Sequence, residues 1–291
     1  MANHPPYEPY PYPVQFCRVK PGLELAYMDV GKGKKTVLMI HGLGSYAPAW
    51  TRTMEGIQSD ARCIALDMPN YGRSTLGEFP VSLKWMAEVI RDFIKEMGLG
   101  PVVLAGHSMG AQVAVWCHHL RLFLIEQLIL IAPAGVEQFS SMEQRWFRSI
   151  SQFSLLRSMS DHQIRRNFDI NFYGPQEDAA FMLEDRLLLR ENAEAYDLYC
   201  QMIPKCMQAM LDEPIWDLLP EIHVPTLVIF GTDDALVPNK VLHRDLTPEK
   251  VATKGTKRIP GAHLTLLPNA GHFVHWEQAD RTNDAIRKFL H

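Results

Sequence analysis

Six short and almost uninterrupted apolar runs constrain the fold more than any other feature of this sequence. They are residues 36–40, 61–67, 102–106, 128–132, 226–230 and 264–267. Apolar runs without alternation are typical of strands buried on both faces of a parallel sheet. Helical patterns over residues 82–97 and 109–120 lie between some of these runs. Strands that alternate with helices predict an α/β fold, with a mostly parallel central sheet flanked by helices.

The alternation breaks between residues 136 and 219, where several helical patterns occur without a convincing strand. A helical block that interrupts a parallel sheet predicts an inserted helical cap. We therefore expect a first part of the core at residues 1–135, a cap or lid at 136–219 and a second part of the core at 220–291. The first twenty residues are rich in Pro and Tyr and are expected to form an extended arm on the surface.

The overall charge limits the partners of the protein. Lys and Arg number 29 against 33 Asp and Glu, which gives a net charge of −4. Nucleic acids and anionic membranes favour basic surfaces, so neither is expected as a partner. The start of the chain does not resemble a signal peptide, and no apolar stretch approaches the ~20 residues that span a bilayer. We expect a cytoplasmic protein without stable membrane insertion. The sequence does not define its oligomeric state.

The cysteines and histidines offer no pattern of metal ligands. The five cysteines are an odd number without C-x-x-C spacing, so neither a zinc ribbon nor a disulfide framework is indicated. The chain also lacks H-E-x-x-H, the spacing of a common zinc hydrolase site. We therefore expect no metal and no cofactor.

The motif GHSMG at residues 106–110 carries the strongest indication of chemistry. It directly follows the apolar run at 102–106 and directly precedes a helical pattern. A serine on such a tight strand-to-helix turn projects its hydroxyl out of the sheet, and glycines two positions away allow strand and helix to approach closely. The N-terminus of the following helix favours developing negative charge. Ser108 is therefore the candidate nucleophile.

Two further motifs occur in the order seen in a known superfamily. HGLG at 41–44 follows the run 36–40, and DMPNYGRS at 67–74 is similar to a D-x-P-G-x-G-x-S turn. Together with GHSMG, they make residues 20–291 resemble the α/β-hydrolase superfamily, specifically its carboxylesterase-like branch with a helical lid. Asn70 stands where this family usually has Gly, and Asn is the next most tolerant residue of a left-handed conformation.

A serine nucleophile needs a general base, and the base needs an orienting acid. The family order is Ser, Asp, His. The resemblance implies Asp234 as the acid, within GTDDALVP at 231–238, with Asp233 as the alternative. It implies His272 as the base, within NAGHF at 269–273. We expect His275 in the turn before the last helix and His263 at the opposite edge of the sheet, and His107 should pack beneath the nucleophile.

The resemblance also implies an oxyanion hole formed by the backbone amides of Leu43 and Met109. His41 then holds the loop that carries Leu43. The substrate-binding residues are not defined by the sequence. Aromatic residues of the cap either build an apolar pocket or pack the cap onto the core, and they include Trp146, Phe147, Phe153, Phe168, Phe172 and Phe181. Arg165, Arg166, Arg186 and Arg190 could anchor a carboxylate or form a solvated face.

These features predict a serine hydrolase that cleaves carboxylic esters of moderately apolar small molecules through an acyl-enzyme. A carbon–carbon bond hydrolase of the meta-cleavage product type is an alternative. Such enzymes usually have Asn and Gly-Pro-Gly where this chain has His107 and Leu43-Gly44-Ser45. A non-catalytic ligand-binding relative is a third reading. Proteolytic and perhydrolase activities also remain open, whereas Ser108 argues against the dehalogenases and epoxide hydrolases, which use an Asp nucleophile.

Overall fold

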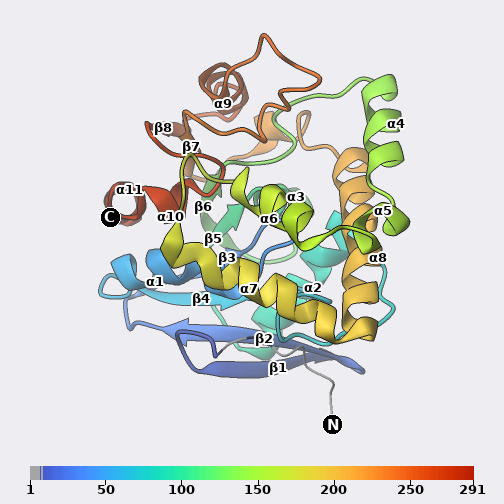
Figure 1. Ribbon diagram of the computed structural model, residues 1–291. Coiled ribbons are helices and arrows are strands. Elements are labelled where there is room, and N and C mark those ends of the chain that lie inside the picture. Colours follow the sequence, from blue (N-terminus) through green and yellow to red (C-terminus); the bar gives the residue numbers. More distant parts are fainter. Residues whose placement is uncertain (1–6, 8) are drawn as a thin grey trace.

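The computed structural model describes Tyr7 and residues 9–291, and its centre is a mostly parallel sheet of eight strands with helices on both faces (Figure 1). The strands lie in the order β1-β2-β4-β3-β5-β6-β7-β8. Strand β2 pairs antiparallel with β1 and β4, and all other neighbouring strands pair in parallel. Their bounds are β1 Val14–Lys20, β2 Leu23–Val30, β3 Lys35–Ile40, β4 Ala61–Leu66, β5 Val102–His107, β6 Ile125–Ile131, β7 Thr226–Gly231 and β8 His263–Leu267. The predicted fold class is confirmed.

The helices fall into those that flank the sheet and those of the stretch between β6 and β7. The flanking helices are α1 Thr51–Ile57, α2 Leu83–Glu96, α3 Met109–His119, α9 Pro248–Thr256, α10 Val274–Glu277 and α11 Ala279–Leu290. The intervening stretch holds α4 Ser141–Ile150, α5 Phe153–Arg157, α6 Asp161–Asp169, α7 Ala180–Leu188 and α8 Ala193–Asp212. Single 3₁₀ turns occur at Ala47–Trp50, Glu177–Ala179, Leu189–Glu191 and Leu219–Glu221.

Alternating residues of each central strand supply two separate hydrophobic layers. In β3, Leu38 and Ile40 pack into one layer, whereas Val37 and Met39 pack into the other. Helices α2, α3 and α9 cover the first layer, and α1, α10 and α11 cover the second. Because both faces are buried, the central strands can be apolar at nearly every position. This explains why the strands were readable as uninterrupted runs.

The beginning of the chain corrects one expectation, because residues 14–20 form the edge strand β1 and not a surface arm. Cys17 and Val19 are buried, while Phe16 and Arg18 point outward. This short alternation is typical of a half-covered edge strand, and neighbouring prolines obscured it in the sequence. Tyr10 is also anchored, since its hydroxyl donates to Asp67 Oδ2 over 2.7 Å. The rest of the predicted arm, residues 1–6 and 8, lies outside the described residues.

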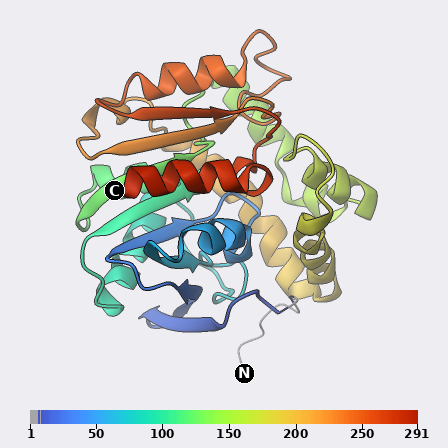
Figure 2. The ribbon, with the colours of Figure 1, turned by 90° about the vertical axis from the view of Figure 1, so that its left-hand side faces the viewer.

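The helical insertion, residues 136–219, lies at one end of the sheet (Figures 1 and 2). Figure 2 shows that the parallel strands of the central sheet point their carboxyl ends toward these helices. The last helix of the insertion is also part of the core, because Met202 and Cys206 of α8 pack into the layer formed with α2 and α3. Beyond α8, the Glu213 carboxylate accepts the amide of Leu83 at the start of α2 over 2.6 Å.

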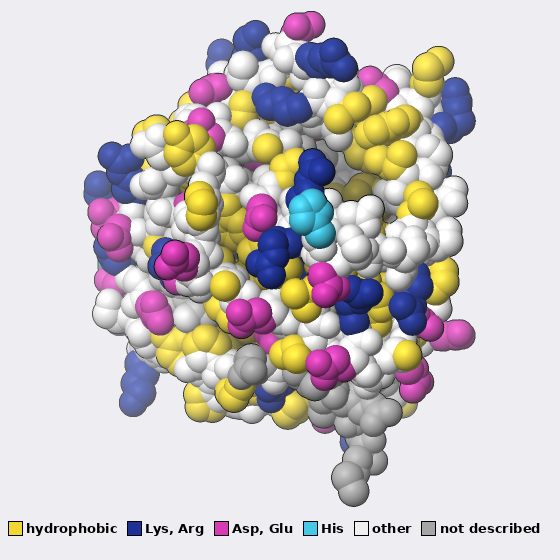
Figure 3. Space-filling model, in the orientation of Figure 1, with side chains coloured by type: hydrophobic (Ala, Val, Ile, Leu, Met, Phe, Trp, Pro, Cys, Tyr) yellow, Lys and Arg dark blue, Asp and Glu magenta, His cyan; other side chains and the backbone are white. Residues whose placement is uncertain are grey.

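The exposed surface of the insertion is apolar in one region. Figure 3 shows a group of hydrophobic side chains over α4 and α5. Met142 and Ile150 of α4 and Leu155 of α5 are among the exposed large apolar residues. Within the part of the chain that the structure describes, no helix combines the length and apolar character needed to cross a bilayer.

Candidate active site

Ser108 stands between β5 and α3 with φ +53° and ψ −115°. A positive φ is unfavourable for a residue with a side chain, so the surrounding structure must hold this conformation in place. The Ser108 amide donates to Ile131 on the adjacent strand over 2.9 Å, and its carbonyl accepts from Ala111 and Ala134 at 3.1 and 3.2 Å. These bonds fix the turn from both sides.

The glycines of the motif are required by close packing of the backbone. A Cβ atom on Gly106 would lie 2.4 Å from the Gly110 carbonyl oxygen, and one on Gly110 would lie 2.3 Å from the Ile40 carbonyl oxygen. Real Cβ atoms do not tolerate such distances to backbone atoms, which have no freedom to move away. Helix α3 therefore begins directly against the carboxyl end of β3, as the spacing of GHSMG predicts.

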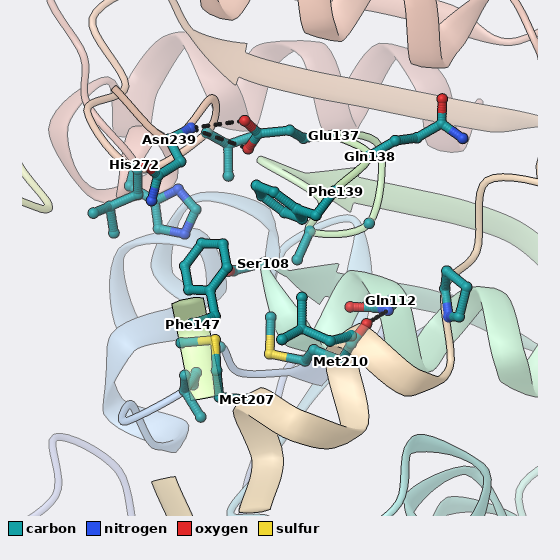
Figure 4. Close-up of a pocket in the computed structure, with 18 of the residues that line it drawn as sticks. Ser108, Gln112, Glu137, Gln138, Phe139, Phe147, Met207, Met210, Asn239 and His272 are labelled. Carbon is teal, nitrogen blue, oxygen red and sulfur yellow. Dashed lines mark hydrogen bonds between the residues drawn. The ribbon is translucent and has the colours of Figure 1, made fainter. Parts of the chain in front are cut away.

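The structure brings His272 and Asp234 together. The His272 Nδ1 atom lies 2.8 Å from Asp234 Oδ2, and both side chains are buried. The other carboxylate oxygen, Oδ1, accepts the amides of Leu236 and Val237 at 2.8 and 2.9 Å. A carboxylate held in this way accepts a hydrogen bond from a protonated Nδ1. The other ring nitrogen, Nε2, is then left as the basic nitrogen. Figure 4 shows the His272 ring on the side of Ser108.

Asp233 is placed differently. Its side chain is exposed, and its Oδ2 accepts the Thr232 hydroxyl over 2.8 Å and the Asn269 amide over 3.1 Å. These contacts tie the turn after β7 to the loop after β8. The geometry therefore favours Asp234 over Asp233 as the partner of His272.

The loop at 41–44 lies against the serine turn. A Cβ on Gly42 would lie 3.0 Å from His107 Nδ1 and 3.2 Å from Ser108 Cβ. His41 holds this loop, because its Nε2 accepts the Met68 amide over 3.1 Å and its Nδ1 lies 2.8 Å from the Gly42 carbonyl oxygen. This arrangement requires a neutral ring, and burial lowers the pKa of His41 to about 4. Leu43 lies in the wall of the site, and Met109 begins α3.

The turn at 67–74 supports the same loop from outside. Asp67 is buried, and its carboxylate accepts the amides of Ala47 and Arg73 at 2.7 and 2.8 Å. Asn70 adopts φ +67°, which confirms the left-handed conformation expected where the family usually has Gly. Its side-chain amide exchanges two hydrogen bonds with the Gly77 backbone, at 2.9 and 2.7 Å.

The loop that carries His272 is clamped to the helical insertion. The Asn171 carbonyl accepts the amides of His272 and Phe273 over 2.8 and 3.2 Å. Glu277 accepts the Gly271 amide on one oxygen over 2.6 Å and the Tyr173 amide on the other over 2.7 Å. The Glu277 carboxylate therefore joins the insertion to the residue before His272.

Ser108 and His272 line a cavity of about 380 Å³ between the core and helices α4 and α8 (Figure 4). Its wall is largely apolar and includes Phe139, Phe147, Met207, Met210, Leu211 and Trp216. Two acidic residues, Glu137 and Asp217, also line it. None of the lining residues that the structure describes is Lys or Arg.

The structure distinguishes among the aromatic residues predicted for the insertion. Phe147 lines the cavity, and Trp146 packs against it with ring centroids 5.1 Å apart. Phe168 and Phe172 belong to a buried core layer, and Phe181 packs on Trp276. Phe153 is partly exposed. The pocket and packing roles are therefore divided among the six residues.

The arginines considered as carboxylate anchors lie away from this cavity. Arg165 and Arg166 are exposed on α6, and Arg190 pairs with Asp161. Arg186 donates to the Gly44 carbonyl oxygen over 2.7 Å and lines a separate, smaller cavity of about 30 Å³.

Sequence reasoning missed several polar residues around the site. Glu137 accepts the Asn239 amide on both oxygens at 3.0 Å, which fixes the loop that follows Asp234 (Figure 4). Gln112 of α3 also lines the cavity. Glu137 has no local signal, because the loops it joins are distant in sequence. Gln112 had one, since it is the single polar residue in the apolar segment 109–117, one helical turn after Ser108.

Two further histidines near His272 are buried and packed against each other. His107 is buried, and its Nε2 lies 3.0 Å from the His272 carbonyl oxygen. His275 lies in α10 with its ring packed 4.6 Å from that of His107. Burial lowers the pKa of His107 well below its usual range and that of His275 to about 3. His263 begins β8, at the edge of the sheet opposite the site, as expected.

These buried histidines predict sensitivity to acid. Below a pH of about 6.5 the unfolded chain takes up protons on His41, His107 and His275 that the native state excludes, so stability falls as the pH falls toward the native pKa values. His275→Leu should remove one such proton. Between pH 6 and pH 5, the free energy of unfolding of this variant, measured by urea unfolding, should fall by about 1 kcal/mol less than that of the wild type. An unchanged pH dependence would contradict this account of His275.

Several known proteins are similar to this chain in sequence or in structure. A 2-hydroxy-6-oxononadienedioate/2-hydroxy-6-oxononatrienedioate hydrolase of Pseudomonas putida is 25% identical over 291 residues, covering 95% of this chain and 96% of that protein. The crystal structure of a probable hydrolytic enzyme from Pseudomonas aeruginosa PAO1 superposes with a TM-score of 0.84 at 22% identity, covering 98% and 96% of the two chains. A thermophilic esterase from Thermogutta terrifontis gives a TM-score of 0.72 at 25% identity, covering 92% and 93%.

The model of a protein family described as "Alpha/beta hydrolase family" matches residues 37–285. This range includes every residue of the site described above. The family match therefore spans most of the chain and both parts of the core. This protein belongs to the alpha/beta hydrolase family.

Proposed function

We propose that this protein is a serine hydrolase that cleaves a carboxylic ester of a moderately apolar small molecule, with Ser108, His272 and Asp234 as its catalytic triad. One observation carries the proposal. A serine in a strained backbone conformation and a histidine bound to a buried carboxylate over 2.8 Å line the same apolar cavity. Nucleophile, base and orienting acid are the groups that acyl transfer requires.

The reaction proceeds in two halves. His272 Nε2 takes the Ser108 hydroxyl proton while the serine oxygen attacks the ester carbonyl. The resulting imidazolium is stabilised by Asp234 and then protonates the departing alcohol, which leaves the acyl group on Ser108. His272 next removes a proton from water, the water oxygen attacks the acyl carbon, and the acid leaves as Ser108 regains its proton.

The amides of Leu43 and Met109 are assigned to the oxyanion. The close packing of Gly42 on Ser108 and the start of α3 at Met109 support this assignment. Backbone amides held by packing need no reorganisation when charge develops on the carbonyl oxygen, and loss of one such donor typically costs ~10²–10³ in rate.

The helical insertion is assigned as the cap, with the core formed by residues 1–135 and 220–291. The arrangement of α4 and α8 along the cavity supports this division. The cap then supplies the apolar wall of Phe147, Met207 and Met210, which suits an apolar part of an ester.

A carbon–carbon bond hydrolase is the second candidate, because several relatives at 24–26% identity are named as hydrolases of 2-hydroxy-6-oxononadienedioate. That name describes a dicarboxylate, and carboxylates are usually bound by Arg or Lys. The cavity of this chain is lined by Glu137 and Asp217 and by no described cation. A dicarboxylate therefore matches the charge of this cavity poorly, and ester hydrolysis is the first candidate.

Hydrolysis of a p-nitrophenyl ester series from acetyl to palmitoyl tests the proposed triad. Ser108→Ala should lower kcat by roughly 10⁶, because the nucleophile is lost while the buried site stays intact.

Asp234→Asn should lower kcat by about 10⁴ by disturbing the His272 tautomer, whereas the matched variant Asp233→Asn should have a small effect. Equal losses for the two aspartates would contradict the assignment of the acid. Turnover of a 2-hydroxy-6-oxo dienedioate without ester turnover would establish the second candidate instead.

The clamp formed by Glu277 predicts a positioning role. Glu277→Gln replaces one acceptor by an NH₂ group, which has to face the Gly271 or the Tyr173 amide. The loop of His272 should then shift, and kcat should fall about tenfold with little change in KM. Glu55→Gln, an exposed residue on α1, is the matched control. Wild-type kcat in Glu277→Gln would show that the clamp does not position the base.

A further inference from the structure

Gln112 places an unused hydrogen-bond acceptor in the wall of the cavity. Its side chain is buried, and its Nε2 donates to the carbonyl oxygens of Met210 and Glu213 at 2.8 and 3.0 Å. Its Oε1 accepts no hydrogen bond from any residue that the structure describes. Figure 4 shows the amide beside Met210, with its oxygen on the side of Ser108.

The orientation of this amide is fixed by its surroundings. Turning it over would place Oε1 against two carbonyl oxygens and would strand the NH₂ group, so the present orientation is strongly preferred. Gly135 keeps the space beside it, since a Cβ there would lie 3.2 Å from Gln112 Cδ and 2.7 Å from Ile215 Cγ1. The acceptor is therefore held in one direction.

An unsatisfied acceptor in an apolar wall is costly, and a bound donor removes that cost. Ser108 precedes α3 and Gln112 lies in the first turn of this helix, so their backbones are about one helical turn apart. Both residues line the same cavity, so a group bound at Oε1 lies close to the carbonyl that Ser108 attacks. Met207, Met210 and Leu211 surround the space between them with apolar surface.

We infer that Gln112 is a specificity determinant, and that the preferred ester carries a hydroxyl or N–H donor a few atoms from its carbonyl and no carboxylate. This inference rests on the proposed function, which supplies the ester. A carboxylate at the same place would meet Oε1 without a proton to share, in a cavity that already holds Glu137 and Asp217. A hydroxyl or N–H group would complete the hydrogen bonds of the wall.

Two sets of three esters of matched size test the inference. In one set the alcohol part varies: 4-hydroxybutyl butanoate, 3-methoxypropyl butanoate and 4-butanoyloxybutanoate. In the other the acyl part varies: butyl 6-hydroxyhexanoate, butyl 5-methoxypentanoate and monobutyl adipate. In at least one set, kcat/KM of the wild type should be about tenfold higher for the hydroxyl ester than for the methoxy ester, and lowest for the carboxylate.

Gln112→Met keeps the length of the side chain and removes the acceptor. The hydroxyl-to-methoxy ratio of kcat/KM should then fall to about one, whereas Gln138→Met, an exposed glutamine at the same cavity, should keep the wild-type ratio. Because the ratio is taken within each variant, a general loss of folded enzyme does not change it. A ratio of one in the wild type, or a preserved preference in Gln112→Met, would overturn the inference.

Binding to Ser108→Ala separates this inference from the proposed function. Calorimetric titration of the same esters should give a Kd about tenfold lower for the hydroxyl ester, and Gln112→Met in the Ser108→Ala background should abolish the difference. A Gln112-dependent difference in binding without any turnover by the wild type would leave the recognition site standing and refute the hydrolase. Turnover that needs Ser108 but shows no donor preference in either assay would refute the recognition site alone.

Discussion

The contact between the start of α3 and the end of β3 is the constraint on which the site depends. Gly110 packs on the carbonyl oxygens of Ile40 and His41, and no residue with a Cβ fits there. This contact brings the serine turn against the loop at 41–44, so backbone packing sets the positions of the proposed nucleophile and of the loop proposed to bind the oxyanion. The positive φ of Ser108 is held by the same packing and by its bond to Ile131. Side-chain flexibility has little part in this half of the site.

The other half depends on contacts between distant segments. His272 is oriented by Asp234 from the turn after β7, and its backbone is held by Asn171 of the insertion. Glu277 adds a second link between the insertion and the same loop. A shift of the helical insertion would therefore move His272, the proposed base. Helices α4 and α8 contribute part of the cavity wall, namely Gln144, Phe147, Met207, Met210 and Leu211.

Much of this arrangement was predictable from local patterns. The central strands were readable because both faces of the sheet are covered, and Ser108, Asp234 and His272 were readable because each follows a buried strand in a short motif. Strand β1 was missed because an edge strand buries only alternate residues. Glu137 and Glu277 were not identified as loop clamps, because their partners lie in other loops and no local pattern encodes such a contact. The division of the aromatic residues of the insertion between core and cavity likewise depends on how helices pack, which periodicity alone does not determine.

Covalent trapping tests the central claim most directly. The Ser108 oxygen should attack the phosphorus of diethyl 4-nitrophenyl phosphate and displace 4-nitrophenolate, leaving one diethylphosphoryl group on the protein. Tryptic cleavage after Lys95 and Arg121 yields a peptide in which Ser108 is the only serine, so the site of the added mass is unambiguous. One adduct per chain is expected, in peptide 96–121, and none is expected in Ser108→Ala. An unmodified 96–121 peptide in protein exposed to excess reagent would contradict the assignment of Ser108 as the nucleophile.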